Sequence, residues 1–193
     1  MVAPLTPGAA DFGPGTAPTL VVKVGSALLV EQSGDVRSEW LSALVAELAE
    51  RIRAGQRLVI VSSGAIALGA RRLGLEKGGR ASIADAQAAA SVGQIALAGL
   101  WADLFAAEGL RAAQMLLTLD DFEDRRRFLT AANALARLLE LGAVPVINEN
   151  DSTATDEIRF GDNDRLAARV AQAAHADGVV LLSDVDGLYD RNP

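Results

Sequence analysis

Short runs of aliphatic and β-branched residues alternate along the chain with longer segments of helical periodicity. Five of these runs predict strands, at residues 19–24, 57–62, 112–118, 143–148 and 178–183, the first with the profile of a buried strand. Most of them have the length and the Val, Ile and Leu content of a strand that is covered on both faces. The pattern therefore predicts a sheet of five strands.

The segments between the strands predict helices. Apolar residues between 41 and 52 recur on one helical face, with Ser38 placed to cap the start of the helix and Gly55 to end it. A second helical stretch follows Ser63-Gly64 and stops at Gly74. Further helices are predicted at 82–107, with a break near Gly93 or Gly99, at 124–141 and at 164–176.

The order of these elements indicates the fold class. Strands that alternate with helices at this spacing form parallel βαβ units, whose helices cover both faces of the sheet. We therefore expect an α/β protein, a three-layer α/β/α sandwich around a mainly parallel sheet, formed by residues 19–193. Residues 1–18 contain four prolines and no basic residue. They lack the basic start of a secretory signal, and we expect them to form a mobile leader.

Composition narrows the classes of function. The chain carries 18 Lys and Arg against 25 Asp and Glu, a net charge of −7, which argues against a surface that neutralises nucleic acid or anionic lipid. Because there is no cysteine, disulfides, thiolate metal sites and thiol catalysis are excluded. The single histidine, His175, is expected at a solvated helix position, and no metal site of protein side chains is expected.

The longest apolar segment, residues 86–102, is expected to be a buried helix. It contains Gln87, Ser91 and Gln94 and lies between Asp85 and Asp103, a polarity that suits a protein core better than a membrane span. We therefore expect a cytoplasmic protein without membrane or nucleic-acid partners.

Polar residues gather where the predicted strands end. They are Lys23 and Gly25 in and after the first run, Ser63 and Gly64 after the second, residues 148–151 at the fourth, and Ser183-Asp184 at the last. In an open α/β sheet, ligands bind at the carboxyl ends of the strands. Small polar residues are also what tight turns require, but four such turns together favour a binding site.

Lys23 is the most informative of these residues because it lies inside an apolar run. An unpaired buried lysine would cost several kcal/mol, so Lys23 is expected to reach the end of the strand and meet an anion. Glycines at 25 and 64 would let backbone N–H groups approach phosphate or carboxylate oxygens. Residues 161–164 open a predicted helix, whose free N–H groups also favour an anion.

The common nucleotide and hydrolase motifs do not account for this pattern. The chain has no G-x-x-x-x-G-K-[ST], G-x-G-x-x-G, G-x-S-x-G, S-x-x-K or H-E-x-x-H sequence. Their absence weighs against P-loop, dinucleotide-binding, serine hydrolase and zinc protease functions.

Six motifs instead carry a resemblance to a known family. They are Val-Val-Lys23-Val-Gly25-Ser26, Val-Ser-Ser63-Gly64-Ala-Ile, Gln114-Met-Leu-Leu-Thr, Val-Ile-Asn148-Glu-Asn-Asp151, Phe-Gly-Asp162-Asn-Asp164 and Leu-Ser183-Asp184-Val-Asp-Gly-Leu-Tyr189. In this order, from about residue 19 to the end, they resemble the amino acid kinase family. The Asn-Glu-Asn-Asp and Gly-Asp-Asn-Asp pair is specific for the members that phosphorylate glutamate.

The resemblance implies a reaction and its partners. Such enzymes use ATP and Mg²⁺ to phosphorylate the side-chain carboxylate of L-glutamate, giving γ-glutamyl phosphate, the first step of proline biosynthesis. The resemblance further implies a homo-oligomer and proline as a feedback inhibitor.

The same resemblance assigns roles to eight residues. It implies that Lys23 binds the nucleotide phosphates and the transferring group together with Gly25, that Ser183 and Asp184 contact the nucleotide, that Ser63, Asp151 and Asn163 hold glutamate, and that Asp162 organises the catalytic lysines.

Two alternatives remain open. One is another amino acid kinase, acting on acetylglutamate, carbamate or a nucleoside monophosphate, against which the glutamate-specific motif pair weighs. The other is a truncated homologue that binds glutamate or proline and transfers nothing. Glutamate-phosphorylating members continue past the Asp-x-x-Gly-Leu-Tyr pattern through the nucleotide lobe, and often into a C-terminal PUA-type domain. This chain is therefore expected to hold the acceptor lobe and only the start of the nucleotide lobe.

Overall fold

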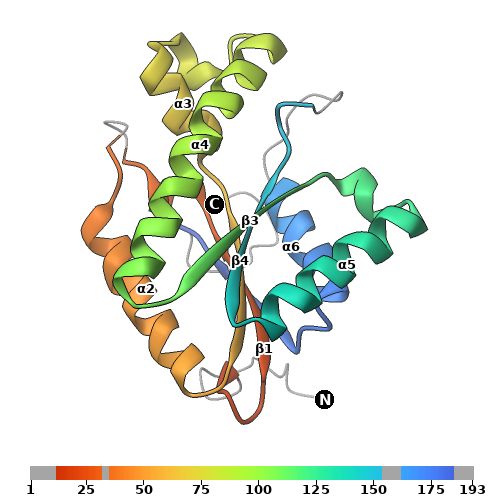
Figure 1. Cartoon of the computed structure of the whole chain (residues 1–193). Coiled ribbons are helices and arrows are strands. Elements are labelled where there is room, and N and C mark those ends of the chain that lie inside the picture. The colour runs from red at the N-terminus through yellow and green to blue at the C-terminus, as the bar shows by residue number, and fades with distance from the viewer. Residues whose placement is uncertain (1–11, 32–34, 154–161, 185–193) are drawn as a thin grey trace, which may run out of the picture.

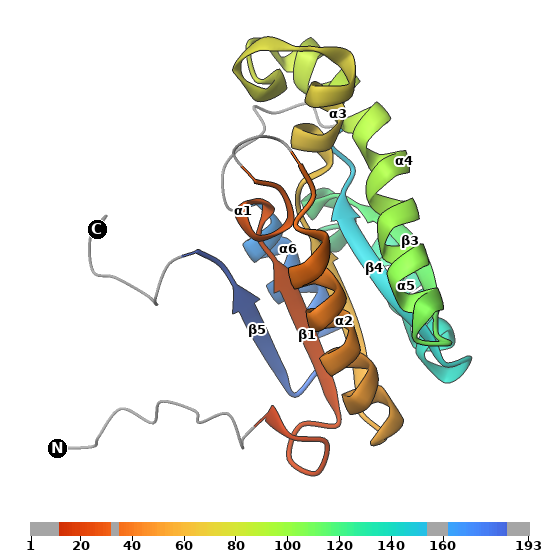
Figure 2. The same cartoon turned by 90° about the vertical axis from the view of Figure 1, so that its left-hand side faces the viewer.

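A parallel sheet of five strands forms the centre of the computed structural model, which describes residues 12–31, 35–153 and 162–184. The strands are β1 (Thr19–Val24), β2 (Arg57–Ser62), β3 (Arg111–Leu117), β4 (Ala143–Glu149) and β5 (Gly178–Leu182). Their order across the sheet is β3-β4-β2-β1-β5, and all four pairings are parallel. β5 and β3 form the two edges (Figure 2).

Helices cover both faces of the sheet (Figure 1). One layer contains α2 (Ser38–Arg53) and α4 (Ile83–Ala107), with α3 (Ala65–Leu73) packed against α4, and the other contains α5 (Arg125–Glu140) and α6 (Asp162–Ala173). Three short helical elements connect them: α1 (Ser26–Leu29), η2 (Glu76–Gly79) and η3 (Leu119–Phe122). The predicted three-layer α/β/α sandwich is therefore confirmed.

Side chains that alternate along each strand supply the two cores. In β2, Leu58 and Ile60 pack in the core under α2 and α4, whereas Val59 and Val61 pack in the core under α5 and α6. Because both faces are covered, the central strands are continuous apolar runs, which is why the hydrophobic pattern located them.

Most predicted helices agree with the structure to within a few residues. The prediction at 82–107 corresponds to α4, whose Ser82 side chain caps the helix by accepting a hydrogen bond from the N–H of Asp85 at 3.0 Å. The expected break near Gly93 or Gly99 was wrong, since α4 is continuous through both residues.

Two further details of the helix predictions were wrong. Ser38 does not cap α2, because its Oγ donates to the carbonyl of Val36 and the capping position belongs to Arg37. The last predicted helix begins earlier and ends earlier, at Asp162 and Ala173. His175 follows it in a turn with φ of 48° and is exposed, so it is solvated but not helical.

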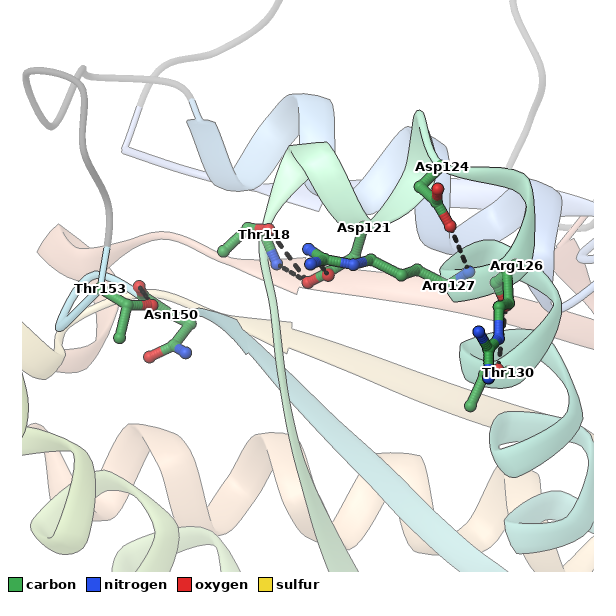
Figure 3. Close-up of polar contacts among 8 residues, drawn as sticks. All are labelled: Thr118, Asp121, Asp124, Arg126, Arg127, Thr130, Asn150 and Thr153. Atoms are coloured by element: carbon green, nitrogen blue, oxygen red, sulfur yellow. Dashed lines mark hydrogen bonds and ion pairs between the residues drawn. The ribbon is translucent and has the colours of Figure 1, made fainter.

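The start of α5 is fixed by two aspartates (Figure 3). Asp121 accepts hydrogen bonds from the backbone N–H of Thr118 at 2.7 Å and from its hydroxyl at 3.0 Å. Asp124 caps α5 by accepting from the N–H of Arg127 at 2.8 Å. These short-range bonds define how the chain leaves the edge strand β3.

Residues 12–18, at the end of the expected leader, pack against the fold. Gln56 is 2% exposed, and its Nε2 donates to the carbonyls of Phe12 at 2.9 Å and Ala17 at 2.6 Å. Residues 1–11 lie outside the described part of the chain.

Among the described residues, α4 is the one helix with the length and composition that could cross a membrane. Its Trp101 and Phe105 are fully buried in the core beneath the sheet, with their rings stacked at 5.9 Å. Only about a third of its most apolar window is buried, so α4 packs on the core with one face and is less buried than the sequence predicted.

Two glycines bring α3 and α4 into backbone contact. A Cβ at Gly93 of α4 would overlap the carbonyl of Ala65, and a Cβ at Gly69 of α3 would overlap the carbonyl of Ala89. The close crossing therefore requires the absence of a side chain at both positions. It also fixes the start of α3, which lies immediately after the carboxyl end of β2.

A charged contact fixes the start of α6 above the sheet. Lys23 lies on β1, between β2 and β5, and is only 9% exposed. Its Nζ lies 2.6 Å from Oδ1 of Asp164 in the first turn of α6. The anion that Lys23 was predicted to meet is therefore, in this structure, a carboxylate of the same chain.

We predict that Gly93→Ala lowers the free energy of unfolding by about 1–3 kcal/mol, because the added methyl group forces α3 away from α4. Gly99→Ala on the same helix is the matched control. Nothing lies within 4 Å of a Cβ at Gly99, so the better helix propensity of alanine should raise stability by about 0.5–1 kcal/mol. Urea denaturation measures both, and equal effects would contradict the close crossing.

We also predict that Asp164→Asn lowers the free energy of unfolding by about 1–2 kcal/mol, because a buried ammonium loses its charged partner while Asp164 itself is nearly half exposed. Adding Lys23→Met should recover part of the loss. Glu140→Gln, in the exposed pair with Arg137, should change stability by less than about 0.5 kcal/mol. Denaturation of the single and double variants measures the coupling, and strictly additive losses would refute it.

Candidate active site

A cavity of about 340 Å³ lies at the carboxyl ends of four strands, β1, β2, β4 and β5. Its walls contain seven of the eight residues selected from the sequence: Lys23, Gly25, Ser63, Asp151, Asn163, Ser183 and Asp184. The eighth, Asp162, is the first residue of α6, and its side chain lies outside the described part of the chain. The strands are parallel neighbours, so their carboxyl ends meet at one edge of the sheet.

Ser63 and Asn163 meet in this wall although they are 100 residues apart. Nδ2 of Asn163 donates to Oγ of Ser63 at 2.9 Å and to Oδ1 of Asn148 at 3.3 Å. Because Ser63 Oγ accepts this bond, its own proton can be donated to a ligand. Oδ1 of Asn163 is buried and has no hydrogen-bond partner within the described residues. The acceptor capacity of this atom is therefore unused in the structure.

Asn148 joins the same network, although the sequence analysis did not select it. It is 2% exposed and lines the cavity, and its Nδ2 donates to Oε1 of Gln94 at 2.7 Å. The signal was available: Asn148 continues the buried run of Val146 and Ile147, and a buried amide in that position needs partners. Nothing in the sequence identified Gln94 as that partner.

Gly25 contributes space beside the Lys23 ammonium. The sequence suggested that its N–H would face a phosphate, but that N–H donates to the carbonyl of Leu182 at 3.0 Å. A Cβ at Gly25 would lie 3.7 Å from Lys23 Nζ and 3.3 Å from the same carbonyl oxygen. A side chain here would therefore crowd the ammonium and the end of β5.

The turn after β2 requires its glycine. Gly64 has φ of 109°, in the left-handed region, and a Cβ there would approach Cδ2 of Leu29 to 3.1 Å. α3 starts at the next residue, and residues 64–67 line the cavity. The first N–H groups of a helix have no partner within the helix, so the start of α3 offers donors at this wall.

The remaining wall carries charges of both signs. Asp151 follows β4 and is 8% exposed, whereas Ser183 and Asp184 follow β5 and are exposed. Arg80, between η2 and α4, also lines the cavity and was not predicted. It follows no strand, so the argument from strand ends could not find it.

Comparison with known proteins agrees with the resemblance found in the sequence. The chain is 70% identical over 182 residues to a glutamate 5-kinase of Sphingopyxis alaskensis, covering 94% of this chain and 50% of that protein. It is 72% identical over 178 residues to a glutamate 5-kinase of Novosphingobium aromaticivorans, covering 92% and 47%. The chain therefore spans about half the length of these curated relatives.

The fold is shared with a more distant solved structure. The crystal structure of a T. acidophilum isopentenyl phosphate kinase product complex superposes with a TM-score of 0.60 at 21% identity, covering 91% of this chain and 74% of that one. The amino acid kinase family itself matches residues 18–193, nearly the whole chain. By sequence and by fold, the chain belongs to the amino acid kinase family.

Proposed function

We propose that the cavity is the acceptor site of an ATP-dependent kinase that phosphorylates the side-chain carboxylate of L-glutamate. One observation carries the proposal together with the similarity to glutamate 5-kinases. Asn163, whose buried Oδ1 has no partner within the described residues, lines the same cavity as Ser63, Asp151 and Lys23. This combination suits an amino acid whose second carboxylate receives a phosphoryl group.

Each polar group of the cavity is assigned to one of the charged groups of glutamate. The α-ammonium group donates to the carboxylate of Asp151 and to Oδ1 of Asn163, both of which are acceptors. A carboxylate accepts from the hydroxyl of Ser63 and from the first N–H groups of α3. For Ser63 and Asn163, this assignment uses the donor and the acceptor that their hydrogen bond to each other leaves open.

The reaction requires no general base. A glutamate side chain has an ordinary pKa of about 4.3, so the attacking carboxylate is already ionised. The single histidine, His175, is exposed and has no part in the proposed reaction. A carboxylate oxygen forms the new bond to the γ-phosphorus, and the bond to the bridging oxygen breaks as ADP leaves. Lys23 offsets the negative charge on the transferring group.

The nucleotide enters as Mg-ATP. Among the described residues, no group of three or more His, Asp or Glu side chains is placed to hold a metal ion. In the proposal, Mg²⁺ is carried by the phosphates, since Mg²⁺ keeps several waters and takes one or two protein carboxylates. Ser183 and Asp184 are proposed to contact the nucleotide, and Asp162 to organise the cationic groups.

The resemblance extends the proposal beyond the reaction. It includes a place at the first step of proline biosynthesis, feedback inhibition by proline, a homo-oligomer and a cytoplasmic location. These features are supported by the similarity to glutamate 5-kinases and by no contact described above.

Asp151→Asn should weaken L-glutamate binding about 10- to 100-fold, since losing a charge-assisted contact costs about 1.5–3 kcal/mol. Isothermal titration calorimetry on the chain measures the affinity, and denaturation verifies that the variant is folded. Asp103→Asn, an exposed aspartate on α4, is the control and should bind as the wild type does. Unchanged glutamate affinity in folded Asp151→Asn would remove the basis of the proposal.

Lys23→Met should lower kcat about 100-fold or more while the glutamate Kd changes less than about threefold, because the ammonium acts mainly on charge that develops in the transition state. The measurement is glutamate-dependent ADP formation in a protein extended to the length of the relatives. Wild-type kcat in the variant would contradict the role of Lys23. Glutamate binding without any ADP formation by the unsubstituted protein would favour a binding module.

A further inference from the structure

We propose that Gln94 is a positioning residue for the amino-acid site. It does not line the cavity among the described residues. It acts through Asn148, whose amide it orients, and so keeps Oδ1 of Asn163 available for the ammonium group of the amino acid. This inference rests on the proposed function of the cavity and adds a residue that neither the strand-end argument nor the resemblance selected.

The hydrogen bond between Gln94 and Asn148 has a defined direction. Oε1 of Gln94 accepts from Nδ2 of Asn148 at 2.7 Å. With Nδ2 committed to Gln94, the other end of the Asn148 amide, Oδ1, faces Asn163 and accepts from it at 3.3 Å. Asn148 is 2% exposed, so water has little access to replace either partner.

A reversed Asn148 amide would change the hydrogen bonds of Asn163 and Ser63. If Asn148 turned by half a rotation, its NH₂ group would face the NH₂ group of Asn163, and two donors would oppose each other. Asn163 would relieve this conflict by turning its own amide. Its Oδ1 would then face Asn148 and Ser63 instead of remaining unpartnered. The site would lose both the acceptor for the ammonium and the free proton of Ser63.

The packing of α4 holds Gln94 in position to orient the Asn148 amide. It lies on α4, in the helical layer opposite α6, which carries Asn163. The preceding residue, Gly93, is in backbone contact with α3. Two turns further on, Nε1 of Trp101 on the same helix donates to Oγ of Ser62 at 2.9 Å. Asn148, at the end of β4, is thus contacted from both layers.

Three substitutions separate this role from simple packing. Gln94→Met keeps the length of the side chain and removes the acceptor, whereas Gln94→Glu keeps an acceptor at the same place. Gln87→Met is the matched control, because it makes the same change on the same helix at a residue that takes no part in the bonds from Asn148 to Gln94 and Asn163.

In calorimetry on the chain, Gln94→Met should weaken L-glutamate binding about 5- to 50-fold, whereas Gln94→Glu and Gln87→Met stay within about threefold of the wild type. On an Asn148→Ala background, Gln94→Met should cause no further loss, because its effect passes through Asn148. A loss that is equal in both backgrounds, or equal in Gln94→Met and Gln94→Glu, would overturn the inference.

A measurement without ligand keeps this test separate from the proposed function. In ¹⁵N NMR spectra of the free chain, the side-chain amide resonances of Asn163 should shift in Gln94→Met and stay in place in Gln87→Met. Resonances of Asn163 that do not move would overturn the inference. If they move while the wild type fails to bind glutamate, the orienting role of Gln94 is supported and the proposed function is refuted.

Discussion

The burial of one ammonium group determines how the functional end of this molecule is built. Lys23 lies on a central strand and is only 9% exposed, so the fold must supply an anion at the end of that strand. Asp164 does so from the first turn of α6, at 2.6 Å. Asn163, the residue before Asp164 on α6, donates to Ser63 just after β2. The charged pair and the proposed amino-acid site both involve the first turn of α6.

A chain of amides then joins the two helical layers across the end of the sheet. Asn163 belongs to α6 and Gln94 to α4, and both bond to Asn148 at the end of β4. Nδ2 of Asn148 and Nδ2 of Asn163 each have an acceptor in this network, whereas the buried Oδ1 of Asn163 has no partner within the described residues. Buried amide acceptors are normally satisfied, and this one belongs to a residue that lines the cavity in which the ligand is proposed to bind.

Features that depend on the chain's own pattern were predictable, and features that depend on packing were not. β1 and β2 were found because strands covered on both faces are apolar runs, and Lys23, Ser63 and Asp151 were found because they lie in or just after such runs. Gln94 and Arg80 were missed because their positions follow from the α3–α4 crossing and from the loop after η2. The free N–H expected at Gly25 failed for a similar reason, since the partner, the carbonyl of Leu182, is distant in sequence.

The most direct test of the account is a titration of the ¹⁵N-labelled chain with L-glutamate, followed by backbone amide shifts. The account predicts saturable shifts at residues 63–67, at Asp151 and at the start of α6, with little change in α2. Saturable shifts confined to the separate cavity between β3 and α5, lined by Met115 and Arg126, or no saturable shifts at all, would contradict an amino-acid site at the carboxyl ends of the central strands.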